Sequence, residues 1–134
     1  MINSNELRLG NLFIDIEGKG YCNPGSIQRV DNIDTDGVNR WDDMGALGCC
    51  PFDKMGPILL TPEILGKCGF KYNGYGYEPK DPSNGFEGIN DRGDGEYILS
   101  INDGEYTTGT GFKYFHQLQN LYFALTGIEL NVNL

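Results

Sequence analysis

The sequence predicts an α+β fold, in which antiparallel strands pack against an amphipathic helix near the C-terminus. The run Phe112–Leu130 is the only long segment whose apolar residues recur at a helical period. Elsewhere short apolar runs are separated by turn residues, and 20 glycines among 134 residues far exceed the usual share of about 7%. A chain of this length can bury a core, so we expect a single domain over residues 1–134.

The N-terminal part predicts a strongly bent antiparallel sheet, either an SH3-like barrel or a meander. Asn5–Ile16 has the apolar content of two short strands with a bend at Gly10. Ile27–Ile33 is a further strand, and Asp36-Gly37 predicts a hairpin whose return strand is Val38–Trp41. The following stretch, 45–56, carries several turn residues, and we expect it to be irregular.

A short helix is predicted in the middle of the chain. Thr61 can cap its N-terminus, and Pro62 suits the first helical position, where its missing N–H is not needed. Gly69 can end the helix. A helix of about two turns is unstable alone, so it must pack against other elements.

A second meander follows the short helix. Asn73-Gly74 between aromatic residues predicts a hairpin. The similar stretches Asp94-Gly95-Glu96-Tyr97 and Asp103-Gly104-Glu105-Tyr106 predict two more turns, with Tyr97–Ile101 as a strand between them.

The C-terminal helix should pack on these strands through one apolar stripe. The stripe contains Phe115, Leu118, Leu121, Tyr122 and Leu125. Burying each of these side chains would contribute roughly 1.5–3 kcal/mol before the loss of entropy is subtracted. Gly127 can then end the helix in the left-handed conformation.

The charge balance argues against general binding to nucleic acid or to an anionic membrane. Lys and Arg total 10 against 19 Asp and Glu, which gives a net charge of -9 and an isoelectric point near 4.4. An acidic surface can instead meet a basic protein, including by imitating DNA. The N-terminus lacks the pattern of a signal peptide, and no run is apolar for long enough to span a membrane, so we expect a cytoplasmic protein.

Three segments resemble a family of small proteins encoded by phages, prophages and mobile elements of bacteroidete bacteria. They are Asn5–Leu12 (NELRLGNL), Ile58–Phe70 (ILLTPEILGKCGF) and His116–Leu130 (HQLQNLYFALTGIEL). The resemblance implies an origin in such an element and action inside a bacterial host cell. It transfers no catalytic residue.

The strongest candidate binding segment precedes the C-terminal helix. Thr107, Thr108, Gly109, Thr110 and Gly111 are expected to form a loop that runs into the helix, with Lys113 in its first turn. Free N–H groups at a helix start, hydroxyl groups and a lysine together would hold a phosphate group. The alternative is that Thr110 is only an N-cap and that the glycines make a turn.

Aromatic and basic side chains could complete a nucleotide site. Trp41, Tyr75 and Tyr77 could stack on a base, and Arg40 or Arg92 could pair with a phosphate. The alternative is that most of these rings pack in the core or on a sheet face.

Enzyme chemistry has little support in the sequence, so we expect no catalytic residue, no metal and no cofactor. His116 is the single histidine, and no nucleophile elbow or metal-binding histidine motif is present. The four cysteines show no C-x-x-C spacing, which favours reduced thiols over a zinc or redox site. The calcium-like run 32–43 is better explained as the hairpin at Asp36-Gly37.

These observations predict a non-enzymatic phage or mobile-element protein that acts against host defence by binding. One hypothesis is that it sequesters a small nucleotide signal, for which a deep pocket in a homo-oligomer is favoured. An alternative is an acidic inhibitor that occludes a basic site on a host protein in the manner of a DNA mimic. A third is an accessory structural protein of the mobile element. The sequence does not identify the ligand, the partner or the oligomeric state.

Overall fold

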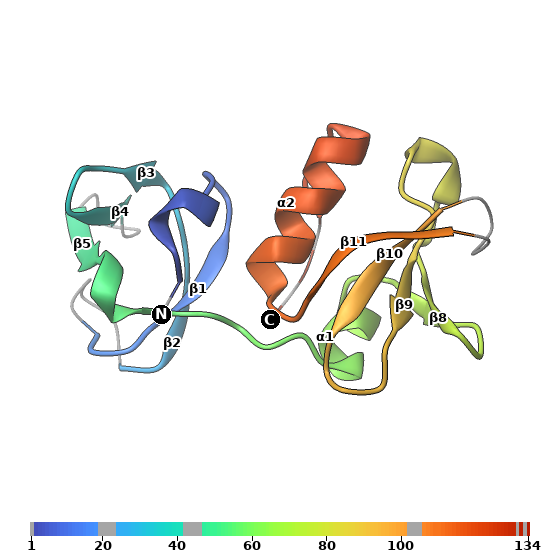
Figure 1. Cartoon of the computed structure of the whole chain (residues 1–134). Coiled ribbons are helices and arrows are strands. Elements are labelled where there is room, and N and C mark those ends of the chain that lie inside the picture. The colour runs from blue at the N-terminus through green and yellow to red at the C-terminus, as the bar shows by residue number, and fades with distance from the viewer. Residues whose placement is uncertain (1, 19–23, 42–46, 102–105, 131, 133) are drawn as a thin grey trace. The chain divides into compact units, whose positions relative to one another are not determined.

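The chain divides into two compact units, unit 1 (Met1–Ile58) and unit 2 (Leu59–Leu134), which are described separately (Figure 1). The computed structural model describes residues 2–18, 24–41, 47–101, 106–130, 132 and 134, with the backbone alone at 40, 41, 47, 101 and 106–110. Its described strands form three antiparallel sheets, which confirms the predicted α+β class. The sheets are not closed into a barrel, so the SH3-like alternative is wrong. The single domain over residues 1–134 stays a prediction.

Unit 1 contains two three-stranded antiparallel sheets, with the strand orders β2-β1-β6 and β3-β4-β5. Their strands are β1 (Leu12–Asp15), β2 (Ser26–Arg29), β3 (Asn32–Ile33), β4 (Gly37–Trp41), β5 (Leu47–Pro51) and β6 (Met55–Gly56). The predicted turn at Asp36-Gly37 is confirmed, because the Asp34 N–H donates to the Gly37 carbonyl at 2.9 Å and Ile33 pairs with Val38.

The core of unit 1 is built from apolar side chains of both sheets and of the N-terminal segment. Its members are Ile2, Phe13, Val30, Val38, Cys50 and Met55, with Leu7 and Phe52 packed against them. Phe13 on β1 and Met55 on β6 are at most 1% exposed, so the first sheet contributes the largest side chains.

The N-terminal segment differs from the two strands that the sequence predicted. Ser4–Glu6 form a 3-10 helix, η1, and only the part from Leu12 onward is a strand. The Asn3 side chain accepts a hydrogen bond from the Asn5 N–H at 3.1 Å, and such local bonds from an asparagine favour turns over strands. The predicted bend at Gly10 is present, with φ of +90°.

The stretch around Cys49 and Cys50 forms strand β5 and is not irregular, so that prediction was wrong. All of its residues pair with β4, from Gly37 opposite Pro51 to Trp41 opposite Leu47. Gly37 permits a close approach, because a Cβ atom there would lie 2.3 Å from the Cys50 carbonyl oxygen. This cross-strand contact is not visible from the local sequence.

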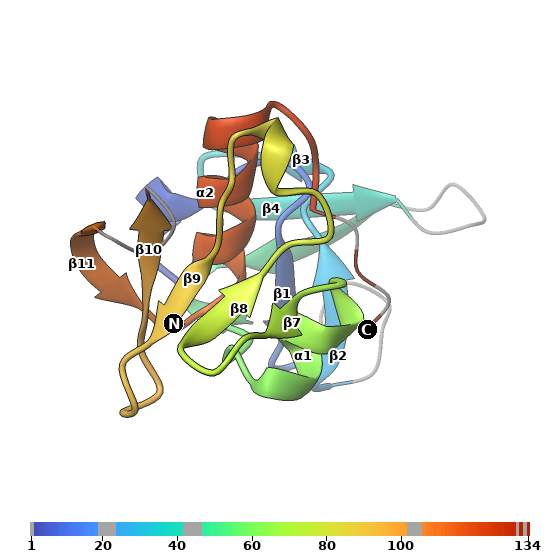
Figure 2. The same cartoon turned by 90° about the vertical axis from the view of Figure 1, so that its right-hand side faces the viewer.

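Unit 2 has one five-stranded antiparallel sheet in the order β11-β10-β9-β8-β7. The strands are β7 (Lys71–Tyr72), β8 (Gly76–Glu78), β9 (Ile89–Asp91), β10 (Tyr97–Ile101) and β11 (Tyr106–Phe112). Figures 1 and 2 show helix α2 (Phe115–Thr126) lying along one face of this sheet.

The predicted short helix is α1 (Pro62–Lys67), and its signals are confirmed. The Thr61 hydroxyl accepts a hydrogen bond from the Ile64 N–H at 3.2 Å, and Pro62 is in the first turn. Gly69 follows the helix with φ of +89°. Leu65 is fully buried and anchors α1 in unit 2.

Helix α2 packs through the first half of its predicted stripe. Phe115 and Leu118 are fully buried, and the Tyr122 ring contacts Phe86 at 5.2 Å between centroids. Leu125 is 42% exposed, so its predicted burial was wrong. The contact at this turn is made by backbone instead, because a Cβ atom on Gly85 would lie 2.7 Å from the Leu125 carbonyl oxygen.

The turns of the second meander are largely as predicted. Asn73 donates its N–H to the Gly76 carbonyl at 2.9 Å, and Gly74 has φ of +99°, which confirms the hairpin between β7 and β8. Gly95 also has a positive φ, in the turn between β9 and β10. The turn predicted at Asp103-Gly104 lies outside the described residues.

Candidate functional site

The predicted phosphate loop is a strand. Thr107, Thr108, Gly109, Thr110 and Gly111 belong to β11, an edge of the sheet, where Thr107 pairs with Ser100 and Thr108 with Leu99. The expected loop at a helix start was therefore wrong. The alternative reading of Thr110 as an N-cap was also wrong, because Tyr114 is the residue that precedes α2. Runs of threonine suit strands, and hydrogen bonding to β10 favoured the strand over the loop.

The start of α2 is occupied by the chain's own groups. The Gln117 side-chain oxygen accepts hydrogen bonds from the N–H groups of Lys113 and Tyr114, both at 3.1 Å. The Lys113 ammonium lies 5.4 Å from the centroid of the Tyr114 ring. The Lys113 carbonyl accepts from the Leu60 N–H at 2.8 Å. The backbone of Lys113 thus holds the start of α2 to the segment before α1. The side chain of Lys113, the predicted phosphate ligand, lies near the Tyr114 ring instead.

Two other predicted ligand residues, Arg92 and Gly111, do lie close together, but a carboxylate lies beside both of them. Arg92 Nη1 is 3.8 Å from Glu96 Oε2. A Cβ atom on Gly111 would lie 2.8 Å from Glu96 Oε2 and 3.3 Å from Arg92 Nη1. Because Glu96 offsets the charge of Arg92, this surface does not favour a phosphate group.

The predicted stacking residues are divided between the two units. Arg40 and Trp41 are in β4 of unit 1, and their side chains lie outside the described residues. Tyr75 and Tyr77 are in unit 2, where both contribute to one pocket. The structure therefore brings the two tyrosines to one pocket, and the binding role of all four residues stays a prediction.

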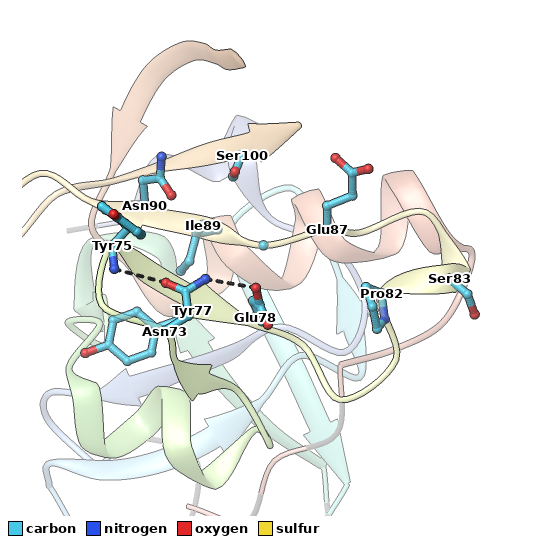
Figure 3. A pocket seen from close by; sticks show the side chains of 11 residues that line it. Asn73, Tyr75, Tyr77, Glu78, Pro82, Ser83, Glu87, Ile89, Asn90 and Ser100 are labelled. Carbon is cyan, nitrogen blue, oxygen red and sulfur yellow. Dashed lines mark hydrogen bonds between the residues drawn. The ribbon is translucent and has the colours of Figure 1, made fainter. Parts of the chain in front are cut away.

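The pocket has a volume of about 630 Å³ and lies across strands β8, β9 and β10 (Figure 3). Its polar and aromatic lining comes from Asn73, Tyr75, Glu78, Glu87, Asn90 and Ser100. Tyr77, Pro82, Ser83, Gly88 and Ile89 complete it. Ligand pockets span roughly 300–1,000 Å³, so the size suits a small molecule or a short peptide segment.

Strand register determines which face of the sheet carries the polar groups. Tyr77 pairs with Ile89, and both are buried. Gly76 pairs with Asn90, one position along, so these two residues face the opposite side. Gly76 opens the space beside Asn90, because a Cβ atom there would lie 2.9 Å from Asn90 Oδ1 and 2.1 Å from the Ile89 carbonyl oxygen. One face of the sheet thus packs inward, and the other carries the polar groups of the pocket.

The amide group of Asn73 organises one wall. Its oxygen accepts hydrogen bonds from the N–H groups of Tyr75 at 3.0 Å and Gly76 at 2.9 Å. Its nitrogen donates to Glu78 Oε1 at 2.9 Å (Figure 3). The hairpin tip therefore fixes both a carboxylate and the backbone of Tyr75, whose side chain is 84% exposed.

The pocket is acidic. Its lining residues, all of which are described, include Glu78 and Glu87. They include no Lys, Arg or His. Burial, followed by the nearby charge of Asp91, raises the pKa of Tyr77, so this phenol stays neutral around neutral pH. The lining is thus rich in hydrogen-bond acceptors and negative in charge. Such a lining attracts a cationic ligand and repels a phosphate.

Sequence reasoning found the tyrosines of this pocket and missed its polar lining. Glu78, Glu87, Asn90 and Ser100 come from separate elements, and only the pairing of β8, β9 and β10 brings them together. The hairpin at Asn73-Gly74 was the one available signal, because it places Tyr75 at an exposed tip. No spacing in the sequence points to the other residues.

No known protein family, no curated protein and no solved structure matches the chain. The resemblance to phage and mobile-element proteins therefore stays a prediction. Among the described residues, no three potential metal ligands are grouped. None of the described helices combines the length and the apolar character needed to cross a bilayer.

Proposed function

We propose that the chain is a non-enzymatic binding protein that occupies a basic site on a partner protein, with the pocket of unit 2 as its main contact. The observation that carries this proposal is the pair Glu78 and Glu87 in a pocket without a basic lining residue. The net charge of -9 would in addition steer a basic partner toward the chain.

The sequestering of a small nucleotide has less support. The threonine and glycine residues expected to hold its phosphate are in strand β11, and the pocket that contains Tyr75 is acidic. The resemblance to phage and mobile-element proteins suggests a setting for the favoured function, in which the basic partner belongs to a host defence system. An accessory structural role in the element would need no such pocket.

Titration with short charged probes tests the proposal. We expect hexalysine to shift the amide NMR signals of Gly76, Asn90 and Ser100, whereas linear and cyclic nucleotides leave them unchanged. Removing both charges with Glu78→Gln and Glu87→Gln should weaken hexalysine binding about tenfold or more, since hydrogen bonds to charged groups contribute about 1.5–3 kcal/mol. Binding should also weaken as salt is added.

A matched control keeps the change in net charge and moves it out of the pocket. Glu63→Gln with Asp53→Asn removes two exposed carboxylates from other surfaces. This variant should bind hexalysine almost as well as the unchanged chain. Equal loss in both double variants would mean that only the overall charge matters, and nucleotide binding in the pocket would contradict the proposal outright.

A further inference from the structure

We propose that the pocket of unit 2 selects an arginine side chain of the partner, with the guanidinium group stacked on Tyr75 and its N–H groups directed to Glu78, Glu87 and Ser100. This inference rests on the proposed function and makes it more specific. It names one cationic group and the residues that distinguish it from lysine.

The first argument is a polar side chain that lines the pocket. Ser100 is 8% exposed and lines the pocket, and its hydroxyl has no hydrogen-bond partner among the described residues. Its backbone is held in place because the Ser100 N–H donates to the Gly88 carbonyl at 2.9 Å. A hydroxyl oxygen that lines a pocket can accept a hydrogen bond from a ligand in place of water. A ligand with several N–H donors would use this acceptor.

The second argument is the pair of carboxylates. Glu78 is positioned by the Asn73 amide at 2.9 Å, which engages one of its two oxygen atoms. Glu87 has no ion-pair or hydrogen-bond partner among the described residues. Carboxylates only accept hydrogen bonds, and a guanidinium group offers five donors in a fixed planar arrangement. A planar group can therefore be shared by acceptors on different strands.

The third argument is the exposed ring at the pocket edge. The Tyr75 side chain is 84% exposed, yet its N–H is fixed by Asn73 at 3.0 Å at the hairpin tip (Figure 3). A flat aromatic face attracts cations, and arginine stacks on such faces better than lysine does. The volume of about 630 Å³ leaves room for the residues on either side of the arginine. The ligand is therefore an arginine within an exposed segment of a protein.

Three capped tripeptides that differ only at the central residue test the selectivity. Acetyl-Gly-Arg-Gly-amide should bind at least about fivefold more tightly than its lysine counterpart, because only the planar cation both stacks and bridges acceptors. The citrulline counterpart keeps the planar shape without the charge and should not bind measurably. Amide NMR titration measures all three and locates them through the signals of Tyr75, Gly76, Asn90 and Ser100.

Variants of two tyrosines on the same hairpin distinguish stacking on Tyr75 from the effect of losing any exposed ring of this hairpin. Tyr75→Ala should reduce the affinity for the arginine peptide to that for lysine, and Tyr75→Phe should preserve the preference. Tyr72→Ala removes a ring that is 63% exposed and does not line the pocket, so the preference should be unchanged. Ser100→Ala should weaken the arginine peptide more than the lysine peptide.

The possible failures are distinguishable. If both cationic peptides bind equally and depend on Glu78 and Glu87, the proposed function stands and the arginine inference is overturned. If the citrulline peptide binds as well as arginine, the charge is irrelevant and both proposals are overturned. A selectivity that survives Tyr75→Ala would show that the ring does not stack on the guanidinium group and would overturn the arginine inference.

Discussion

Buried polar groups are treated differently in the two units. In unit 1, Asn11 is fully buried and accepts from the Arg8 N–H at 2.7 Å, and Asp15, 1% exposed, accepts from the Gly18 N–H at 2.8 Å. Both therefore fix local turns of the backbone. In unit 2, Ser100 is 8% exposed and directs its hydroxyl into a pocket. In unit 1 these two polar groups thus stabilise the backbone, whereas Ser100 in unit 2 lines the pocket that we propose as the binding site.

The largest expected effect separates the stabilities of the units. Phe13 is 1% exposed in unit 1, and Phe86 is fully buried in unit 2, where its ring contacts Phe70 and Tyr122. Replacing either with alanine should lower the free energy of unfolding by about 3–5 kcal/mol, because a cavity is left in a packed core. We expect each loss to be confined to the unit that contains the substitution.

Intrinsic probes can report the two units separately. The single tryptophan, Trp41, is in unit 1, and seven of the eight tyrosines are in residues 59–134. Under urea, Phe86→Ala should shift the transition seen by tyrosine circular dichroism and leave the tryptophan fluorescence transition in place. Phe13→Ala should do the reverse. If both probes always move together, the chain is instead the single cooperative domain that the sequence predicts.

A second, smaller effect concerns the glycines where strands approach closely. Gly76→Ala in unit 2 and Gly37→Ala in unit 1 would each place a Cβ atom within 2.3 Å of a facing carbonyl oxygen. Each should lower the free energy of unfolding by about 1–3 kcal/mol through overpacking. Only Gly76→Ala should also weaken hexalysine binding, since it fills space beside Asn90.

Gly66→Ala is the matched control for this pair. No atom lies within 4 Å of a Cβ built on Gly66, which is in helix α1. Alanine there should raise the stability by up to about 1 kcal/mol, because it favours the helix. Urea unfolding of the three variants gives the comparison, and a stabilising Gly76→Ala would show that the strands can move apart.

The smallest effect is a difference in thiol reactivity between the units. Burial raises the pKa of the Cys68 thiol in unit 2 from 9.0 to about 12, whereas Cys49 in unit 1 is exposed. At mildly alkaline pH, iodoacetamide should modify Cys49 and leave Cys68 protonated and unmodified. Mass spectrometry of the digested protein measures both. Equal rates at the two sites would contradict the burial of Cys68.

The same pKa shift predicts a direction for stability. In the unfolded chain Cys68 loses its proton near its ordinary pKa of 9.0, and in the folded chain only near 12. The contribution of the protonated Cys68 thiol to the free energy of unfolding is fully present below pH 9.0. It is then lost, and the free energy of unfolding falls, as the pH rises toward 12. Cys68→Ala should reduce this fall, as urea unfolding at several alkaline pH values can show.

The features that the sequence predicted correctly are local ones. The cap of α1 needs only Thr61 and Pro62, and the hairpin needs only Asn73 and Gly74, because each turn is decided within a few residues. The strand at 107–111 was missed because glycine and threonine also suit loops, and pairing with β10 decided its state. The lining of the pocket was missed for the same reason, since Asn90 and Ser100 meet only through strand register.

The amide of Asn73 makes the pocket sensitive to the age of the protein. Its nitrogen donates to Glu78 at 2.9 Å, and it precedes Gly74, whose lack of a side chain lets the Gly74 backbone nitrogen attack the side-chain carbonyl carbon of Asn73. Ring closure would release ammonia, and water would then open the cyclic imide to aspartate or isoaspartate, neither of which has a donor for Glu78. Two carboxylates would then repel each other at the rim. Old molecules would thus lose the hydrogen bond that holds Glu78 in the wall beside Tyr75.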